Sequence, residues 1–389
     1  MVSEKYFASV FPDIKYDSEA NKYSLELYGR PRSNLNVNIG GTIATRKISQ
    51  VFLSGEYYYF DNYLSKNTAD FYAGSFYKSA HVRSRFYLSG GFPFYIEPSF
   101  TFNSRDFLSS DDIFLADEPP TVLDRADRSY ALNLGLPITN KFKAVLSGSF
   151  INNDDFYGNA LDINSTDTLD NLELKGNRFG FSLEEGDLNR KQYASKGKSL
   201  YFGFDYFSID EEYRPGTTGT SLVNRDSHQW IRLFGKWEQY FNKGKWSTGY
   251  LVQGAYSNQG TFTNFLGTLV NLPSFNPLQD SRTLLLQNYR AFSYAAFGLK
   301  NVYAITSSLD FRLEGYIYKP FEILSQTEDL FGRTAVPDQM YIIGSSAMVL
   351  HSPVGPISIA VNYYDDSENQ WGVLLHIGYL LFNRNSLGN

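Results

Sequence analysis

Few residues in this sequence have the types and spacing that chemistry requires. The four histidines, His81, His228, His351 and His376, stand far apart, and no two have the spacing of a metal-binding motif. Cysteine is absent, which excludes disulfides, thiolate nucleophiles and thiolate zinc ligands. A phospholipase would need a serine beside a histidine on adjacent strands, and His228 with a nearby serine is the one weak candidate for such a pair. We therefore expect no catalytic residue, no metal site, no cofactor and no enzymatic activity.

Pairs of acidic residues recur, mostly where a loop or a strand end is predicted. Solvated loop charge explains them, with calcium or a cation bridging lipopolysaccharide as an unsupported alternative. The pairs are Asp111-Asp112, Asp154-Asp155, Glu184-Glu185, Glu211-Glu212 and Asp365-Asp366. The net charge of −6 supplies no basic excess for phosphates, so nucleic acid is not an expected partner.

The composition indicates a chain that divides its apolar residues between alternate positions. Aromatic residues make up 17% of the 389 residues, yet the mean hydropathy is only −0.33. No run of 18 apolar residues occurs, so a transmembrane helix is excluded on length. A membrane-spanning strand needs only about ten residues, of which every second one must be apolar.

Alternation with a period of two runs through segment after segment. In 355–363, Ile357, Ile359 and Val361 alternate with small or polar residues. The second face is rich in Gly, Ser, Asn and Ala rather than in Lys and Glu, which suits a wet barrel lumen better than the bulk-solvent face of a soluble sheet. A soluble lectin-like β-sandwich is the alternative that does not involve a membrane.

The connections between these segments differ in length. Short turns are expected at 46–47, 242–244 and 352–353, and long polar segments at 109–128, 152–170, 213–226, 258–287 and 322–337. Short turns on one side and long loops on the other are typical of outer-membrane barrels. We therefore predict an all-β fold: a closed transmembrane antiparallel β-barrel of about 16 strands at 33–389, in a bacterial outer membrane, in contact with lipid and lipopolysaccharide.

Residues 1–32 differ from the rest. They predict a strand, a turn at 17–21 and a second strand with alternation at 23–28. We interpret this segment as the remnant of a periplasmic domain, with an N-terminal hairpin or a plug segment as the alternative. The first residues do not have the pattern of a signal peptide.

Several stretches resemble the BamA/TamA surface-antigen superfamily. Residues 23–32, followed by 33–41, look like the last strand of a POTRA domain passing into a first barrel strand. The run SPVGPISI at 352–359 resembles the opening of the penultimate strand in that superfamily. Closest in appearance are the barrels that follow patatin-like phospholipase domains in Bacteroidetes, and the segments 288–294 and 297–301 carry that likeness. No Gly-x-Ser-x-Gly elbow of a patatin hydrolase is present in this chain.

The resemblance implies an arginine motif in a long loop that tucks into the lumen. Its best match is Arg290-Ala291-Phe292, where Ala291 replaces the usual glycine. The implied acidic partner is Glu314, which alternation places on the lumenal face. An arginine offers two-pronged hydrogen bonding to such a carboxylate. The alternative is that Arg290 simply ends a loop while Glu314 pairs with Arg312 or Lys300.

The resemblance also implies a weak lateral seam between the first and last barrel strands. These would be 35–45, with Leu35, Val37 and Ile39, and 371–382, where Gly372 and Gly378 would weaken the pairing further. The implied function is protein translocation or membrane insertion, or the anchoring and export of a fused patatin-like hydrolase. The alternative function is a passive pore or a structural barrel.

Overall fold

The computed structural model describes residues 7–18, 21–31, 33–46, 48–61, 63–88, 92–107, 123–139, 141–158, 168–217, 222–327, 330–366 and 370–387. The acidic pair at 111–112 and the first six residues lie outside these ranges. No helix in the described ranges is long and apolar enough to cross a membrane.

Almost all regular structure in the described ranges is β-strand. The strands are β1 (Phe7–Asp17), β2 (Lys22–Pro31), β3 (Leu35–Ala44), β4 (Gln50–Phe60), β5 (Leu64–Gly74), β6 (Tyr77–Leu88), β7 (Phe94–Asp106), β8 (Leu123–Pro137), β9 (Phe142–Tyr157), β10 (Asp170–Gly186), β11 (Lys198–Arg214), β12 (Asn224–Lys243), β13 (Trp246–Ser257), β14 (Ser293–Ala304), β15 (Leu309–Thr327), β16 (Leu330–Ala335), β17 (Tyr341–Ser352), β18 (Gly355–Tyr364) and β19 (Trp371–Gly378). A short helix, α1 (Phe265–Asn271), and a 3-10 turn, η3 (Gln287–Tyr289), lie between β13 and β14.

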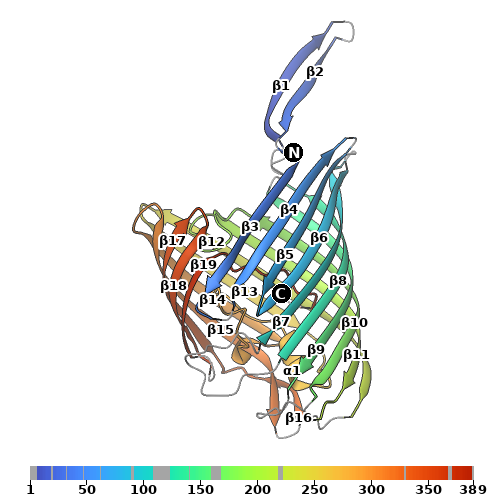
Figure 1. Cartoon of the computed structure of the whole chain (residues 1–389), viewed down its shortest axis with the longest axis vertical. Helices are drawn as coiled ribbons and strands as arrows, with labels where there is room; N and C mark the ends of the chain where they lie inside the picture. Colours follow the sequence, from blue (N-terminus) through green and yellow to red (C-terminus); the bar gives the residue numbers. More distant parts are fainter. Residues whose placement is uncertain are drawn as a thin grey trace.

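Sixteen antiparallel strands, β3 to β15 and β17 to β19, close into a barrel (Figure 1). Each strand pairs with the next along the chain, and β19 pairs with β3 to complete the ring. Strand β16 pairs only with the outer part of β15, while β17 pairs with the rest of β15, so β16 extends one wall beyond the ring. The predicted fold class, a closed barrel of about 16 strands, is confirmed.

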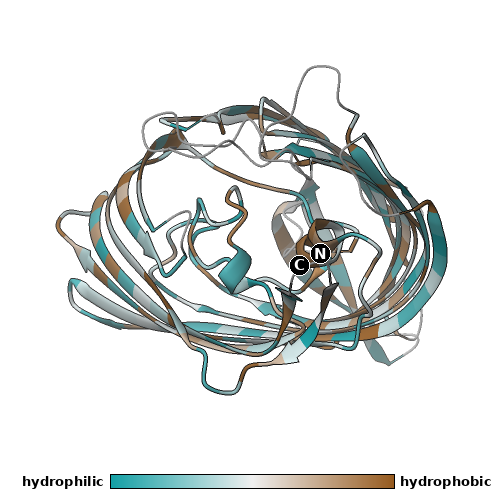
Figure 2. Ribbon diagram, turned by 90° about the horizontal axis from the view of Figure 1, so that it is seen from below, coloured by the Kyte–Doolittle hydropathy of each residue, from teal (hydrophilic) through white to brown (hydrophobic). Residues whose placement is uncertain are grey.

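The alternation in the sequence sorts side chains between the two faces of this wall. On β18, Ile359 and Val361 are exposed on the outside, whereas Ser358 and Asn362 are buried on the inside. Seen along the barrel, hydrophobic and hydrophilic positions alternate along the strands, and further chain segments lie inside the ring (Figure 2). A closed ring with an apolar outer surface and an even number of strands is the architecture of a bacterial outer-membrane barrel.

The two ends of the barrel differ. One end, here called the turn end, carries the short connections 61–63, 138–141, 244–245, 305–308 and 353–354. The other, here called the loop end, carries the long connections 107–122, 158–169, 215–223 and 258–292, together with β16. Long connections mark the cell-surface end of such barrels. Three connections are exceptions. The short connections 45–49, which contains the predicted turn at 46–47, and 75–76 lie at the loop end, and the eleven-residue connection 187–197 lies at the turn end.

Hairpin β1–β2 forms a separate two-stranded sheet beyond the turn end (Figure 1). One of its faces is apolar, where Ile14 lies opposite Leu25 and Tyr16 lies opposite Tyr23, all of them exposed. The other face carries a polar contact between Lys15 and Glu26 at 2.6 Å. The predicted strand-turn-strand therefore forms outside the barrel and does not plug it.

Several strands run further toward the cell surface than the sequence predicted. Strand β15 continues to Thr327 and pairs with β16, although a loop was expected from 322, and β9 continues to Tyr157 through the segment expected as loop from 152. In the extended part of β9, Asn153 and Asp155 face the lumen, and Asp155 pairs with Arg125 on β8 at 3.1 Å. Strand segments whose charged residues are paired inside the lumen therefore have the same polar sequence as a loop, and the sequence alone does not distinguish the two.

The ring closes through a short ladder. Three residue pairs form the ladder between β19 and β3: His376 with Ala44, Ile377 with Ile43, and Gly378 with Thr42. Just beyond the end of β3, the Thr45 amide also donates to the Leu375 carbonyl oxygen at 3.0 Å. By contrast, β10 and β11 are joined by 16 pairs, from Asn171 to Gly186 on β10. The contrast arises because β3 is displaced toward the turn end relative to β19.

This geometry corrects the predicted seam residues. Leu35, Val37 and Ile39 pair with β4 on one side and have no partner on β19. Gly372 pairs with Asn362 on β18. Of the five predicted residues, only Gly378 lies in the closing ladder, because the stagger leaves the start of both strands unpaired on the seam side. The last strand also ends at Gly378 rather than at Phe382, and residues 379–387 turn into the lumen.

Gly378 is the position where the seam tolerates no side chain. Its φ is +98°, and a Cβ there would lie 1.9 Å from the carbonyl oxygen of Gly41. At Gly372, six residues earlier on the same strand, a Cβ would meet nothing within 4 Å. The two glycines therefore form a matched pair for testing the closure.

We expect Gly378→Val to destabilise the closed barrel by at least about 2 kcal/mol, because valine is strained at positive φ and collides with the backbone of β3. Gly372→Val should leave stability close to that of the parent protein. The measurement is the fraction of detergent-extracted protein that resists SDS until boiled. Equal fractions for the two variants would contradict the assigned seam.

Candidate functional site

The connection 258–292, here called the long loop, folds into the barrel from the loop end. Helix α1 begins after Asn264, whose side chain accepts a hydrogen bond from the Gly267 amide at 3.0 Å. At Gly267 a Cβ would lie 2.6 Å from Leu172 of β10 and 2.7 Å from the Tyr157 hydroxyl of β9. The helix is therefore pressed against the inner wall, and glycine permits the close approach.

Arg290 lies at the base of this loop and completes the end of α1. Its guanidinium donates to the carbonyl oxygen of Val270 at 3.1 Å, and Arg125 donates to the same oxygen at 3.2 Å. Cations are favourable at the carbonyl end of a helix. Burial, with the neighbouring Arg125 charge, lowers the pKa of Arg290 to about 10, which leaves it protonated at neutral pH.

Ala291 and Phe292 are both fully buried beside Arg290. Ala291, at the position where the motif usually has glycine, does not have a positive φ, so the backbone there does not require a glycine. The Phe292 ring lies 4.4 Å from the Arg333 guanidinium of β16. The predicted motif residues therefore anchor the base of the loop against the extended wall.

The structure does not bring Arg290 and Glu314 together. Glu314 lies opposite Lys300 on β14, seven residues beyond the start of that strand at Ser293. At the rise of a β-strand, Lys300 and Ser293 are about 23 Å apart along the strand. Glu314 pairs instead with Arg312 at 3.0 Å, which was the alternative drawn from the sequence. The depth of each side chain depends on strand register, which the motif does not encode.

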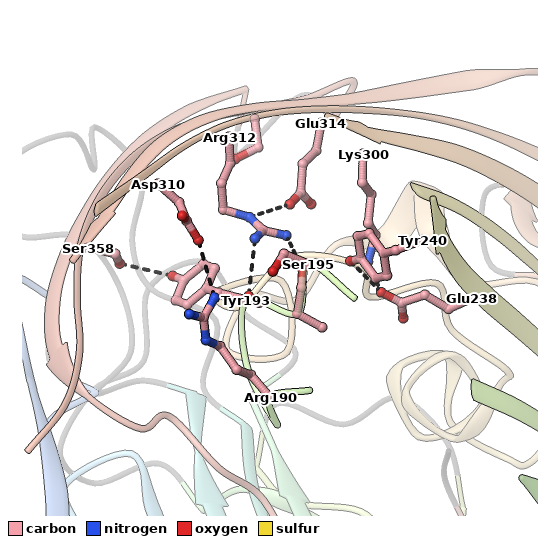
Figure 3. A network of polar contacts seen from close by, with 12 residues as sticks. Arg190, Tyr193, Ser195, Glu238, Tyr240, Lys300, Asp310, Arg312, Glu314 and Ser358 are labelled. Atoms are coloured by element: carbon pink, nitrogen blue, oxygen red, sulfur yellow. Dashed lines mark hydrogen bonds and ion pairs between the residues drawn. The ribbon is translucent and has the colours of Figure 1, made fainter. Parts of the chain in front are cut away.

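Glu314 belongs to a polar cluster at mid-wall (Figure 3). The Tyr316 hydroxyl also donates to its carboxylate. Beside it, Lys300 and Tyr240 both donate to Glu238, each at 2.8 Å. Buried charges of this kind are stable only when paired and hydrogen-bonded.

A second inward segment, the connection 187–197, here called the inner turn, meets this cluster from the turn end. The Arg312 guanidinium donates to the carbonyl oxygens of Tyr193 at 3.2 Å and Ala194 at 2.9 Å. Arg190 lies 3.3 Å from Asp310 (Figure 3). These contacts hold the inner turn against β15.

Tyr193 links the inner turn to the seam. Its hydroxyl lies 2.9 Å from Ser358 on β18 and 2.7 Å from His376, which belongs to the closing ladder. Burial raises the pKa of the Tyr193 hydroxyl, so it stays protonated and donates to one of these partners. The weakest ladder of the barrel is therefore supported from inside.

The tip of the long loop reaches the same depth from the opposite end. Gln192 of the inner turn donates to Gln279 of the tip at 2.9 Å. Asp280 accepts from Asn362 at 2.8 Å and from Tyr364 at 2.6 Å, both on β18. Arg282, two residues further, lines a cavity of about 230 Å³ together with Arg312 and Glu314.

The sequence reasoning missed most of these residues. Arg282, rather than Arg290, is the arginine that the long loop carries to the depth of Glu314. The inner turn and the segment after Gly378 were also missed. A usable signal was present, since Asn189-Arg190-Lys191-Gln192-Tyr193 is a polar stretch too long for a tight turn.

Each histidine has a protein partner. His81 contacts Thr101 at 2.8 Å, His228 contacts Glu211 at 2.6 Å, and His351 contacts Asp310 at 2.7 Å. His228 therefore pairs with a carboxylate rather than with a serine. In the described ranges no group of three His, Asp or Glu side chains could hold a metal ion.

Solved structures with a similar fold identify the type of barrel. BamA from Haemophilus ducreyi lacking POTRA domains 1-3 superposes with a TM-score of 0.62 at 11% identity, over 96% of this chain and 75% of that one. The fold is that of a BamA-type outer-membrane barrel. CdiB from Escherichia coli gives a TM-score of 0.54 at 9% identity, over 96% of this chain and 68% of that one. CdiB from Acinetobacter baumannii gives 0.52 at 8% identity, over 97% and 66%.

At these identities the likeness establishes the BamA-type fold alone. No protein-family model and no curated protein matches the sequence. The chain spans between two thirds and three quarters of the length of the BamA and CdiB chains.

A double-mutant cycle separates the two assignments for Glu314. We expect the Arg312→Ala and Glu314→Ala changes to be coupled by about 1 to 3 kcal/mol, because the two side chains form a buried pair. Arg290→Ala and Glu314→Ala should be additive within about 0.5 kcal/mol. The free energy of unfolding in urea, measured on refolded protein in lipid vesicles, provides both values. Coupling of Arg290 to Glu314 alone would restore the pairing expected from the motif.

Proposed function

We propose that this chain is an outer-membrane barrel that inserts or translocates polypeptides and is not an enzyme. The observation that carries the proposal is the three-pair seam between β3 and β19. BamA and CdiB, whose fold it shares, are barrels of protein insertion and secretion. The exposed apolar belt is proposed to contact membrane lipid and lipopolysaccharide.

The energetics of the wall favour opening at the seam. A backbone hydrogen bond contributes about 1 kcal/mol net in water, but an unpaired group in hydrocarbon costs several kcal/mol. Separating β10 from β11 would expose 16 residue pairs, whereas separating β19 from β3 exposes three. Parting at the seam is therefore the least costly way to open the ring toward the membrane.

The contents of the lumen argue against a passive pore. The long loop enters from one end and the inner turn from the other, and they touch through Gln279 and Gln192. Residues 379–387 cross the interior as well, since Arg232 of β12 donates to the Leu387 carbonyl oxygen. A porin keeps an aqueous channel, whereas here three segments lie across the path.

Two more specific hypotheses, on a fused hydrolase and on the N-terminal segment, have fewer observations in their support. Anchoring or export of a fused patatin-like hydrolase rests on the sequence resemblance alone. The POTRA-like assignment of the N-terminal segment 1–32 is supported by the amphipathic β1–β2 hairpin. A two-stranded hairpin is marginal alone, so its apolar face suits coverage by further protein.

A disulfide across the seam tests the proposal. The chain has no cysteine, so Ile43→Cys with Ile377→Cys introduces the only thiols, at residues paired between β3 and β19. We expect the oxidised protein in vesicles to lose its acceleration of the folding of a second, unfolded outer-membrane barrel protein, and reductant to restore it. Ile359→Cys with Leu375→Cys, across the neighbouring β18–β19 ladder, is the control. Unchanged acceleration with the seam locked would contradict the proposal.

Single-channel recording distinguishes the barrel from an open porin. We expect small and unstable currents in planar bilayers, because the long loop, the inner turn and residues 379–387 fill the lumen. Arg312→Ala removes two hydrogen bonds that hold the inner turn and should make the current larger and noisier. A large, steady conductance in the parent protein would favour the passive pore.

A further inference from the structure

Residues 379–387, here called the tail, cross the lumen from the seam to the far wall. Figure 2 shows the C-terminal end of the chain inside the ring. The tail forms no strand pairing after Gly378. It is nevertheless well packed, since Leu380, Ser386 and Leu387 are buried and the Phe382 ring lies 5.0 Å from the ring of Tyr77 on β6.

The backbone of the tail makes most of its polar contacts, and its side chains add others, such as Asn383 with Ser79 and Asn385 with Arg105. Five tail carbonyl oxygens accept hydrogen bonds from side chains elsewhere in the barrel: Leu380 from Gln192, Leu381 from Gln50, Arg384 from Asn103, Ser386 from Arg178 and Leu387 from Arg232. Three tail amides donate in turn: Leu380 to Gln192, Asn383 to Tyr77 and Ser386 to Asp127. These groups are present in every extended polypeptide, whatever its sequence.

The contacts on the far wall come from consecutive strands. Each of β7 to β12 contributes at least one polar side chain that touches the tail: Asn103, Asp127, Asn153, Arg178, Asp205 and Arg232. Arg105 of β7 also donates to the side chain of Asn385. Cross-strand register places Asn103 beside Asp127 and Asp127 beside Asn153, and Asp205 beside Arg232. We call these six residues the track. It contains both charge signs, so it does not select a strongly charged partner.

The barrel wall does not need the tail for its own pairing. Strands β6 to β12 are joined to one another by long ladders that are complete without it. The tail therefore occupies the track as a ligand would. Four track residues, Asn103, Asp127, Arg178 and Arg232, contact its backbone, and Asn153 and Asp205 contact the side chains of Ser386 and Arg384. Five of the six track residues are more than nine-tenths buried beneath it: Asn103, Asp127, Asn153, Asp205 and Arg232. They would need new hydrogen-bond partners once it left.

We propose that the track is a binding site for extended polypeptide of any sequence, about nine residues long, and that the tail is its built-in, displaceable occupant. The proposal rests on the proposed function, because a translocated or inserting chain would supply such a segment. The tail then keeps the lumen closed until a polypeptide competes for the same backbone hydrogen bonds.

The test uses the full chain and a tail locked in place. Ser79→Cys with Asn383→Cys puts thiols at side chains that are now in hydrogen-bond contact, at 2.8 Å. The probe is a fluorescent peptide with the sequence of residues 379–387, and binding is measured by anisotropy in detergent. We expect no binding to the oxidised protein and binding after reduction, with the single variant Ser79→Cys insensitive to reductant.

Two altered peptides test whether the track recognises the backbone of the peptide or its side chains. A peptide of shuffled sequence should bind within a few-fold of the original, because its backbone is unchanged. N-methylation at the positions of Asn383 and Ser386 removes two donated hydrogen bonds and should weaken binding about tenfold or more. Loss of binding on shuffling would overturn the sequence-independent site, as would equal binding by the oxidised and reduced proteins.

A variant truncated after Gly378 gives an independent measurement. If it is folded by the boiling shift, it should bind the peptide more tightly than the full chain, and equal affinity would contradict displacement of the tail. If it does not fold, the locked full-length variant decides alone. Peptide binding does not require the seam to open, so failure of the track and failure of the insertion activity are distinguishable.

Discussion

Backbone hydrogen bonding in hydrocarbon is the constraint on which this structure depends. No water is available there, so unpaired amides and carbonyls of the wall are costly, and the sheet must close. Closure is uneven, since three residue pairs join β19 to β3, while the two neighbouring ladders have seven and eight pairs and the β10–β11 ladder has 16. The ring is therefore complete and also has one weak line, which faces the membrane.

The interior compensates for that weak line. Tyr193 of the inner turn contacts His376 of the closing ladder, and Gln50 of β4 donates to the carbonyl oxygen of Leu381 just beyond it. The long loop and the inner turn meet across the lumen, and Arg312 ties the inner turn to the wall. Inward-facing polar residues need partners when water is excluded, and these segments provide them. The seam and the lumen contents therefore act as one system.

The alternation in the sequence predicted well which residues of the wall face outward and inward, but it predicted poorly which segments fill the lumen. Alternation identified outward residues such as Ile359 and inward residues such as Ser358, because a strand has a period of two whatever lies around it. The Arg290–Glu314 pairing failed because depth in the barrel is set by strand register and by how far a loop descends, neither of which is local. The last strand was drawn through Leu380 to Phe382 because these apolar residues resemble strand sequence, whereas Gly378 at positive φ turns them inward.

The most direct test of this account is amide hydrogen exchange of the folded barrel in lipid. The amides of Ile43, Thr45 and Ile377 should exchange much faster than those of Phe204 and Phe181, which lie in the middle of the 16-pair β10–β11 ladder. That result would identify the seam as the place where the wall opens. Equally slow exchange at both places would contradict the central claim that closure depends on a short, separable ladder.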